Sequence, residues 1–298
     1  MLDYAALSAL AAVIREGSFE RAAQALFVTP SAVSQRIRSL EERVGCALVV
    51  RGQPCRATDT GRRLCQHVDR VRLLEQELQG TLPALAPEGV TRVALPVAVN
   101  ADSLATWFAP AVAAFAAEAP VLVELAVDDQ DHTAAWLRSG AVLAAVTGTA
   151  RPPAGFNSRP LGAMRYVAAA SPACVARHFS QGVGAASLAR APSLVFNTKD
   201  DLQARWARRL CHRDVELPRH TVPSTHAFVA TALAGMAWGL HPEALIAGHL
   251  RAGRLVELVP DTALDVPLYW QHARVASSLV AGLTRELVAA AAKNLRSP

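Results

Sequence analysis

The fold of the N-terminal part of the chain is decided by residues 17–51, GSFERAAQALFVTPSAVSQRIRSLEERVGCALVVR. Small and polar residues stand in this stretch where helices are expected to begin and end. Gly17 ends a first amphipathic helix over residues 3–15, and Ser18 is placed to cap a second, short helix that ends near Leu26. This pattern predicts short helices joined by tight turns.

A third helix is predicted from Thr29 to Gly45. The Thr29 hydroxyl can cap it, and Pro30 is tolerated at the first helical position, where its missing N–H is not needed. Its apolar residues recur with helical spacing and are expected to face inward: Val33, Ile37, Leu40 and Val44. The opposite face of the helix carries polar side chains: Ser31, Ser34, Gln35 and Arg38.

Two further elements are predicted after the third helix. Residues 47–58 contain a Gly-Gln-Pro turn and predict a pair of short strands, a wing that carries Arg51 and Arg56. A long helix follows over residues 60–79, and its apolar residues recur at a spacing that favours pairing with a second copy of the chain: Leu64, Val68, Val71 and Leu78. Prolines and a glycine over residues 83–89 predict a hinge-like linker.

This N-terminal pattern is typical of a winged helix-turn-helix that binds double-stranded DNA. Ala22 and Ala23 are small enough to let the second and third helices approach closely. Serine and glutamine can pair with base edges, and arginine can reach guanine, phosphate or the minor groove. An ordinary solvated helix surface is the alternative for any single residue, but the combination favours DNA contacts by Thr29, Pro30, Ser31, Ser34, Gln35, Arg38, Arg51 and Arg56.

After residue 90, apolar strands alternate with helices, which favours a mainly parallel α/β sheet. Strands are expected at residues 91–99, 121–127, 142–147, 164–170, 193–197, 218–222, 236–240, 254–258 and 266–273. Helices are expected at residues 103–117, 131–139, 172–179, 200–211, 225–235, 242–251 and 277–295. The late final strand suggests that the chain crosses back, so that two α/β lobes form.

Composition restricts the class of protein. With 52% hydrophobic and 18% charged residues, the 298-residue chain can form sizeable cores, and no apolar run reaches the about 20 residues of a membrane span. The start has no secretory leader, so we expect a cytoplasmic protein. Five cysteines show no metal or disulfide spacing, and no nucleotide-binding, hydrolase or metalloprotease motif is present. We therefore expect no cofactor, no metal and no catalysis.

Charge is distributed in two blocks. Residues 31–63 contain seven arginines and three acidic residues. Between Arg92 and Arg138 there is no lysine or arginine, but six acidic residues: Asp102, Glu118, Glu124, Asp128, Asp129 and Asp131. A basic block followed by an acidic block suggests two partners of opposite charge.

A small-molecule site is expected where the first three strands of the α/β part end. Ligands of open α/β sheets bind outside the carboxyl ends of strands. The polar residues there are Asn100, Asp102, Ser103, Asp128, Asp129 and Thr147. Ser103 and nearby N–H groups could hold a carboxylate, and Asp102 could face an ammonium, which together suit a zwitterion with an extra positive charge. Helix capping and solvation are the alternatives for each residue taken alone.

The N-terminal segment resembles the LysR-type transcriptional regulators. The residues that carry this resemblance are Ala22, Ala23, the stretch Thr29 to Gln35, Ile37, Leu40, Glu41, Gly45, Leu48, Arg51, Thr58 and Gly61. Val49 and Val50 depart from it, since many members have Phe or Glu there, which leaves the fine contacts of the wing open. The resemblance covers the whole chain and implies a linker helix that pairs two chains and a two-lobed effector domain like a periplasmic binding protein.

The effector domain is similar to the lysine- and arginine-responsive LysG/ArgP branch of that family. The similar stretches are VNADSLATWF, DDQDHT, AVTG, LGAMRY, PSTHAF and DVPLYWQ. The resemblance implies a basic amino acid as effector, with Asp200, Ser224 and Thr225 on the opposite lobe. Members often have Glu where this chain has Asp129 or His226, so the choice between lysine and arginine stays open. Trp107, Tyr166 and Trp270 either line the cleft or the hinge, or belong to the core.

The resemblance also implies an assembly and a role. A homodimer that assembles to a tetramer, contact with RNA polymerase, and control of a gene for basic amino-acid export are expected, with activation and repression both open. The limits that we expect are a winged helix-turn-helix over residues 1–58, a linker helix and hinge over residues 59–89, and an effector domain over residues 90–298. An architectural DNA-binding protein without an effector, or a LysR-type regulator of another metabolite, is the alternative.

Overall fold

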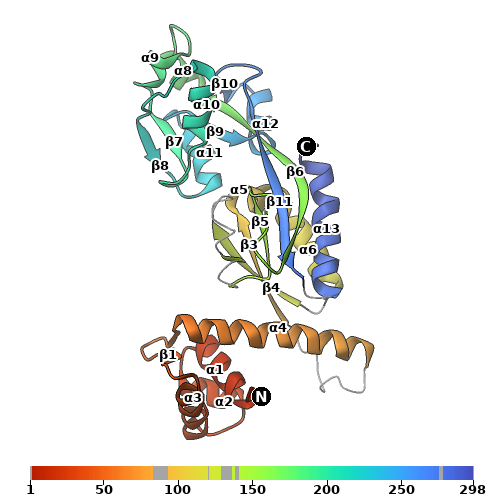
Figure 1. The fold of residues 1–298 in the computed structure, drawn as a ribbon. Helices are drawn as coiled ribbons and strands as arrows, with labels where there is room; N and C mark the ends of the chain where they lie inside the picture. The colour runs from red at the N-terminus through yellow and green to blue at the C-terminus, as the bar shows by residue number, and fades with distance from the viewer. Residues whose placement is uncertain are drawn as a thin grey trace.

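The computed structural model describes residues 2–82, 93–119, 121–128, 136–137, 141–274 and 278–297. Figure 1 shows a small N-terminal unit, a long helix beside it, and two α/β lobes beyond. The N-terminal elements are α1 (Tyr4–Glu16), α2 (Phe19–Ala25), α3 (Pro30–Val44), β1 (Val49–Val50), β2 (Arg56–Ala57) and α4 (Asp59–Thr81). Three helices followed by a two-stranded antiparallel hairpin form the expected winged helix-turn-helix.

The expected helix ends are confirmed at atomic level. Gly17 and Gly45 end α1 and α3 with left-handed backbones, at φ 69° and 79°. Ser18 caps α2 through the N–H of Arg21, and the Thr29 Oγ1 caps α3 by accepting from the N–H of Ala32 at 3.2 Å. Capping residues therefore fix the angles at which the three helices enter the core.

The inward face of α3 is shorter than expected. Val33, Ile37 and Leu40 are buried in one cluster with Ala22 and Ala23, as predicted. Val44 was predicted to face inward and is instead 40% exposed. It lies in the last turn of α3, just before the left-handed Gly45 at which the helix ends, and it does not belong to the buried cluster.

The junction between the hairpin and α4 depends on close backbone contacts. Glu41 of α3 accepts from the Leu48 N–H at 2.7 Å, so α3 holds the start of the wing. The Thr58 hydroxyl donates to the Ala47 carbonyl and also caps α4 by accepting from the Gly61 N–H. A Cβ at Gly61 would lie 2.1 Å from the Leu48 carbonyl oxygen, so only glycine allows this approach.

Helix α4 connects two cores. Val68 belongs to the N-terminal cluster, whereas Leu73, one and a half turns later, is 1% exposed and belongs to the main cluster of the α/β part. The apolar residues predicted to form one stripe along α4 therefore do not share one environment. Leu78, at the end of that stripe, is exposed, and Leu74 one turn before it is exposed as well. The predicted hinge at residues 83–89 lies outside the described residues.

The α/β part contains one large mixed sheet and one small parallel sheet. Its strands are β3 (Val93–Asn100), β4 (Val121–Asp128), β5 (Ala144–Thr147), β6 (Phe156–Ala170), β7 (Ser193–Val195), β8 (Arg219–Thr221), β9 (Gly239–Pro242), β10 (Val256–Glu257) and β11 (Leu264–Ala273). The large sheet has the order β10-β6-β11-β5-β3-β4, with β9 also paired to β6, and β7 pairs with β8. Its helices are α5 (Ala101–Ser103), the π-helix η2 (Leu104–Phe108), α6 (Ala109–Glu118), α8 (Pro172–His178), α9 (Ala185–Leu188), α10 (Leu202–Cys211), α11 (Thr225–Leu233), α12 (Glu243–Arg251) and α13 (Ser278–Asn294).

The prediction of a mainly parallel sheet is wrong. Parallel pairing joins β3 to β4 and β5, but β6 and β11 are antiparallel to each other and to their other neighbours in the large sheet. The reason is topological, because β6 carries the chain from the first lobe to the second and β11 carries it back (Figure 1). The crossing back that the sequence suggested is confirmed.

Strand β6 is twice as long as expected. The prediction began at residue 164, because Pro160 and Gly162 interrupt the apolar pattern before it. The pairing register with β11 shifts between Leu268 and Tyr269, opposite Gly162 and Pro160, so the irregularity falls at Leu161 between these two residues. Most of the predicted helix at residues 131–139 lies outside the described residues.

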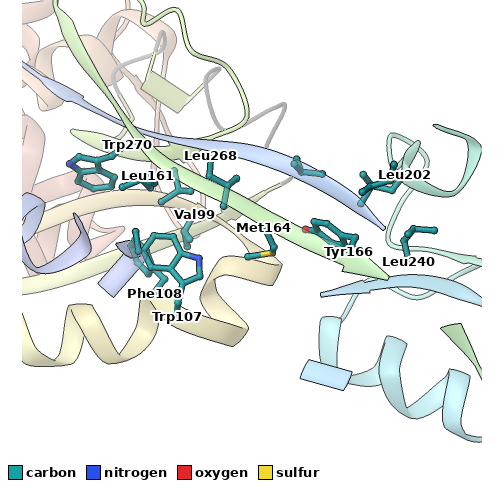
Figure 2. Close-up of a cluster of buried hydrophobic side chains, with 14 of the residues drawn as sticks. Val99, Trp107, Phe108, Leu161, Met164, Tyr166, Leu202, Leu240, Leu268 and Trp270 are labelled. Atoms are coloured by element: carbon teal, nitrogen blue, oxygen red, sulfur yellow. The ribbon is translucent and has the colours of Figure 1, made fainter. Parts of the chain in front are cut away.

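The core of the first lobe is built from large side chains, several of which Figure 2 shows along β6 and β11. Trp107, Tyr166 and Trp270 are at most 2% exposed, so all three belong to the core, and Trp107 also lines a cavity at the hinge between the lobes. The Trp270 indole donates to Thr284 of α13 at 2.8 Å, which ties this helix to the sheet. Tyr166 also keeps a polar contact, described below.

Replacing Gly61 with alanine tests the junction of wing and linker helix. Because the new Cβ would overlap the Leu48 carbonyl, we expect Gly61→Ala to lower the free energy of unfolding of the N-terminal unit by roughly 2–4 kcal/mol. Urea unfolding followed by far-ultraviolet circular dichroism measures this. Gly52→Ala is the matched control, since its Cβ meets nothing closer than 3.6 Å, and it should change stability little. Equal stability of the two variants would contradict the proposed packing.

Candidate functional site

The polar face of α3 is open to solvent. Ser31, Gln35 and Arg38 follow one another at helical spacing and are exposed, and Ser34 is half-buried between them. At the helix start Thr29 and Pro30 are exposed as well, although the Thr29 hydroxyl already contacts Ser31 Oγ at 3.0 Å. The six side chains that the sequence assigned to α3 and its cap therefore run along one side of the helix.

The two wing arginines lie in different surroundings. The Arg51 guanidinium is 5.4 Å from the centre of the Phe19 ring, a cation–π contact that holds the wing against the start of α2. Arg56 lines an open depression of about 680 Å³ together with Arg15, Arg21 and Arg62. No α3 residue lines this depression, so the structure does not place Arg56 with the polar face of α3.

This depression, the arginine groove, was not predicted from the sequence. Glu16 is its acidic lining residue, against four arginines, so the surface is positive. Exposed ion pairs to Glu16 and Asp59 engage Arg15 and Arg62. Arg62 belongs to the basic block of residues 31–63, whereas Arg21 is isolated in the sequence and only the fold brings it to the same place.

In the α/β part, one carboxylate joins three segments of the chain. Asp102 Oδ2 accepts from the Tyr166 hydroxyl at 2.7 Å, and Oδ1 accepts from the Thr225 hydroxyl at 2.9 Å. Asp102 lies in α5 of the first lobe, Tyr166 on the crossing strand β6 and Thr225 at the start of α11 in the second lobe. Asp102 was expected to cap its helix, but Asn100 occupies the cap position and the Asp102 side chain spans the lobes instead.

A small cavity of about 30 Å³ lies beside these contacts. Its polar lining residues are Asp102, Asp200, Thr225 and His241. The volume suffices for about two water molecules and is far too small for an amino acid. No lysine or arginine of the described part of the chain lines it, so the two carboxylates give the cavity an acidic lining that would favour a cation.

Several buried polar groups near the cavity have no partner within the described part of the chain. Both amide atoms of Asn100 and of Gln203, and the Ser103 hydroxyl, are buried without a hydrogen bond. Asn100 and Ser103 flank Asp102, and Gln203 follows the lining residue Leu202. Leaving such groups unpaired costs about 1–3 kcal/mol each, so each of them would gain from a polar partner.

Gln203 was given no role of its own by the sequence reasoning, and His241 was missed. Gln203 interrupts the buried face of α10, where Leu202, Trp206 and Ala207 are its neighbours, and this break in the apolar stripe was the available signal. His241 stands in the buried strand β9. Burial lowers the pKa of His241 to about 4, although the nearby Ala169 backbone favours the charged form. The ring is therefore neutral near pH 7 and can pair with a ligand without repelling a cation.

The remaining predicted residues fall into two groups. Asn100 and Asp128 are paired at the carboxyl ends of β3 and β4, and Thr147 ends β5, so the backbone brings these positions to one edge as expected. Thr147 is buried and accepts from the Thr149 N–H. Asp129 lies outside the described residues, as does the side chain of Asp128.

On the second lobe, two predicted residues already have structural contacts. Asp200 accepts from the N–H groups of Phe196 and Leu202, and so holds the loop before α10. Ser224 caps α11 through the Ala227 N–H. His226 is exposed. In the described ranges there is no group of three or more potential metal ligands, and no helix is long and apolar enough to cross a membrane.

Two family patterns match the chain. The family described as "Bacterial regulatory helix-turn-helix protein, lysR family" matches residues 4–62, and the "LysR substrate binding domain" matches residues 86–292. The HTH-type transcriptional regulator ArgP of Pseudomonas aeruginosa is 50% identical over 297 residues, covering 99% of this chain and 98% of the relative. The regulator LysG of Mycobacterium tuberculosis is 47% identical over 290 residues, covering 97% and 94%.

Solved structures agree with these relatives. The crystal structure of ArgP from Mycobacterium tuberculosis has a TM-score of 0.85 at 44% identity, and both chains are covered completely. Full-length LysG from Corynebacterium glutamicum with bound effector Arg has a TM-score of 0.73 at 38% identity, covering 99% of this chain and 100% of the other. These proteins are transcriptional regulators of one family, with the same helix-turn-helix and effector-domain arrangement. The chain belongs to the LysR family of bacterial transcriptional regulators.

Proposed function

We propose that this regulator senses a basic amino acid, arginine or lysine, in the cavity beside Asp102. The observation that carries the proposal is the Asp102 carboxylate, which contacts both lobes beside a cavity with two acidic residues and no cationic one. The related LysG structure with bound arginine supports the same class of effector. A guanidinium or ammonium group would pair with Asp102, and unpartnered groups of Asn100, Ser103 and Gln203 would serve the ligand's remaining polar atoms.

Effector entry requires the lobes to separate. The cavity is too small for arginine while the Thr225 hydroxyl donates to Asp102, so this bond has to break. A cation at Asp102 replaces the hydroxyl and makes stronger, charge-assisted hydrogen bonds. The ligand therefore favours an arrangement of the lobes that differs from the unliganded one, and it can shift the equilibrium only by that difference in affinity.

For the DNA-binding half, we propose that α3 reads bases and that the wing and the arginine groove hold phosphates. The assigned residues are Thr29, Pro30, Ser31, Ser34, Gln35 and Arg38 for α3, and Arg51 and Arg56 for the wing. Exposed Leu74 and Leu78 on α4 support pairing of two chains through this helix. A dimer then presents two α3 helices to half-sites one or more helical turns apart.

We also propose where the protein acts, how it assembles and what it regulates. The protein acts in the cytoplasm without catalysis, as a homodimer that assembles to a tetramer, and contacts RNA polymerase. It controls a gene for the export of a basic amino acid. The functional division is residues 1–58 for DNA binding, 59–89 for pairing and hinge, and 90–298 for sensing.

Asp102→Asn tests the sensing site. The amide keeps the shape of the carboxylate but loses its charge, so we expect arginine to bind about 30-fold more weakly, a loss of about 2 kcal/mol. Isothermal titration calorimetry of the full-length protein measures this. Asp214→Asn is the control, because that carboxylate is exposed and pairs only with Arg208 in the described contacts. Undiminished arginine binding by Asp102→Asn would exclude this cavity as the effector site, and no heat from the unaltered protein would exclude arginine as effector.

Arg38→Ala tests the reading face of α3. We expect it to weaken binding to an operator selected from random duplexes by about 1–3 kcal/mol and to relax the preference at one base pair. Fluorescence anisotropy with the operator and its single-base variants measures both effects. Arg285→Ala is the control, since this exposed residue lies on α13, and arginine binding should be normal in both variants. An unchanged affinity of Arg38→Ala would show that this face of α3 does not contact DNA.

Arg21→Ala tests the arginine groove separately. Because a phosphate contact carries no sequence information, the variant should bind all duplexes more weakly by a similar factor. The slope of log affinity against log salt should fall by about one. Anisotropy titrations at several salt concentrations give this slope. An unchanged slope would mean that no phosphate lies in the groove.

A further inference from the structure

A second cavity, of about 510 Å³, lies at the hinge between the lobes and plays no part in the proposed sensing of a basic amino acid. We call it the hinge cavity. It is lined from η2 by Thr106 and Trp107, from β6 by Arg165, from α12 by Glu243 and from the C-terminal segment by Arg296. This volume lies in the range of small-molecule sites, and the walls come from both lobes. An occupant would therefore contact both sides of the hinge at once.

The indole of Trp107 points to a missing hydrogen-bond acceptor in this cavity. The side chain is 2% exposed, and its Nε1–H has no partner among the described residues. Figure 2 shows the ring nitrogen on the side that faces Met164, another lining residue. The buried indoles of Trp206, Trp238 and Trp270 all donate to an oxygen, to Thr262, Ala191 and Thr284 respectively. A buried donor without an acceptor is costly, which indicates that a ligand supplies the oxygen.

Charge identifies the class of ligand. Among the described lining residues of the hinge cavity, Arg165 and Arg296 stand against one carboxylate, that of Glu243, so this lining carries a net positive charge. Arg296 pairs with Glu243 at 3.2 Å, and Arg165 pairs with Asp265, which is not a lining residue, at 3.5 Å. The rest of the lining is mostly apolar, with Met164, Leu245 and Leu295 among its members. This is the opposite of the acidic cavity at Asp102, so a basic amino acid does not suit it.

We propose that the hinge cavity is a second small-molecule site, which binds a monocarboxylate with a compact apolar body. The carboxylate accepts from the Trp107 indole and faces the two arginines, and the apolar body lies against the methionine and leucine side chains. The site lies one helical turn from Asp102, and the Thr106 hydroxyl donates to the Asp102 carbonyl at 2.7 Å. Because π-helical turns such as η2 are frequent at functional sites, this segment is suited to connect the two cavities.

The test is a titration of the full-length protein with 4-methylpentanoate, followed by the NMR signals of nitrogen-labelled tryptophan indoles. We expect saturable binding that shifts the Trp107 indole signal downfield, with much smaller changes at Trp206, Trp238 and Trp270. Trp107→Phe assigns the signal and removes the donor. The neutral probe 4-methylpentanamide should bind at least about tenfold more weakly, because it lacks the charge that the arginines attract.

Arg296→Gln tests the cation without disturbing the core, since this side chain is 53% exposed. We expect it to weaken 4-methylpentanoate binding about tenfold, whereas the control Arg285→Gln leaves it unchanged. No saturable shift at about 10 mM probe, equal binding of acid and amide, or unchanged binding by Arg296→Gln would each overturn the proposal. These outcomes do not depend on arginine binding, so they are separate from the test at Asp102.

Discussion

Strands β6 and β11 pair antiparallel from Phe156 opposite Ala273 to Tyr166 opposite Leu264, and the two lobes depend on this ribbon. One strand carries the chain into the second lobe and the other returns it to the first (Figure 1). Hinge closure between domains is absorbed by a few residues, so any rotation of the lobes has to occur along this ribbon. Tyr166 lies at the end of the paired region and donates to Asp102, so the residue at which we propose that the effector binds is held directly by the ribbon.

The two cavities differ in charge although they share the same hinge. Asp102 and Asp200 make the small cavity beside Asp102 acidic, while Arg165 and Arg296 make the hinge cavity basic. With opposite charges, each cavity would disfavour the ligand that we propose for the other, because a like charge in a partly buried site is repelled. The π-helix η2 follows Asp102 directly and lines the hinge cavity, so a shift of this one segment is felt in both places.

Much of the fold followed from local signals in the sequence. Caps at Ser18 and Thr29 and the left-handed Gly17 and Gly45 were predictable because their physical roles depend on neighbours in the chain. The sheet direction and the first half of β6 were not, since Pro160 and Gly162 obscure a strand that only pairing with distant β11 sustains. The prediction that Val44 faces inward was wrong for a similar reason, because helical spacing does not show where a buried core ends.

The site residues could be predicted only where their neighbours in the sequence already mark their role. Asp102 stood out at a strand end, yet its bonds to Tyr166 and Thr225 join residues that are far apart in the chain. Gln203, His241 and Trp107 gave weak signals, since a lone polar group in an apolar stripe gains meaning only when its burial and missing partner are known. The arginine groove likewise gathers Arg21 and Arg62 from separate helices.

The central claim is that a cationic side chain takes the place of the Thr225 hydroxyl at Asp102. A crystal structure of the full-length protein with arginine tests it most directly. We predict a guanidinium or ammonium nitrogen within hydrogen-bond distance of the Asp102 carboxylate, an enlarged cavity beside Asp102, and a Thr225 hydroxyl that no longer donates to Asp102. Arginine bound elsewhere, with the bond between Thr225 and Asp102 intact, would contradict it.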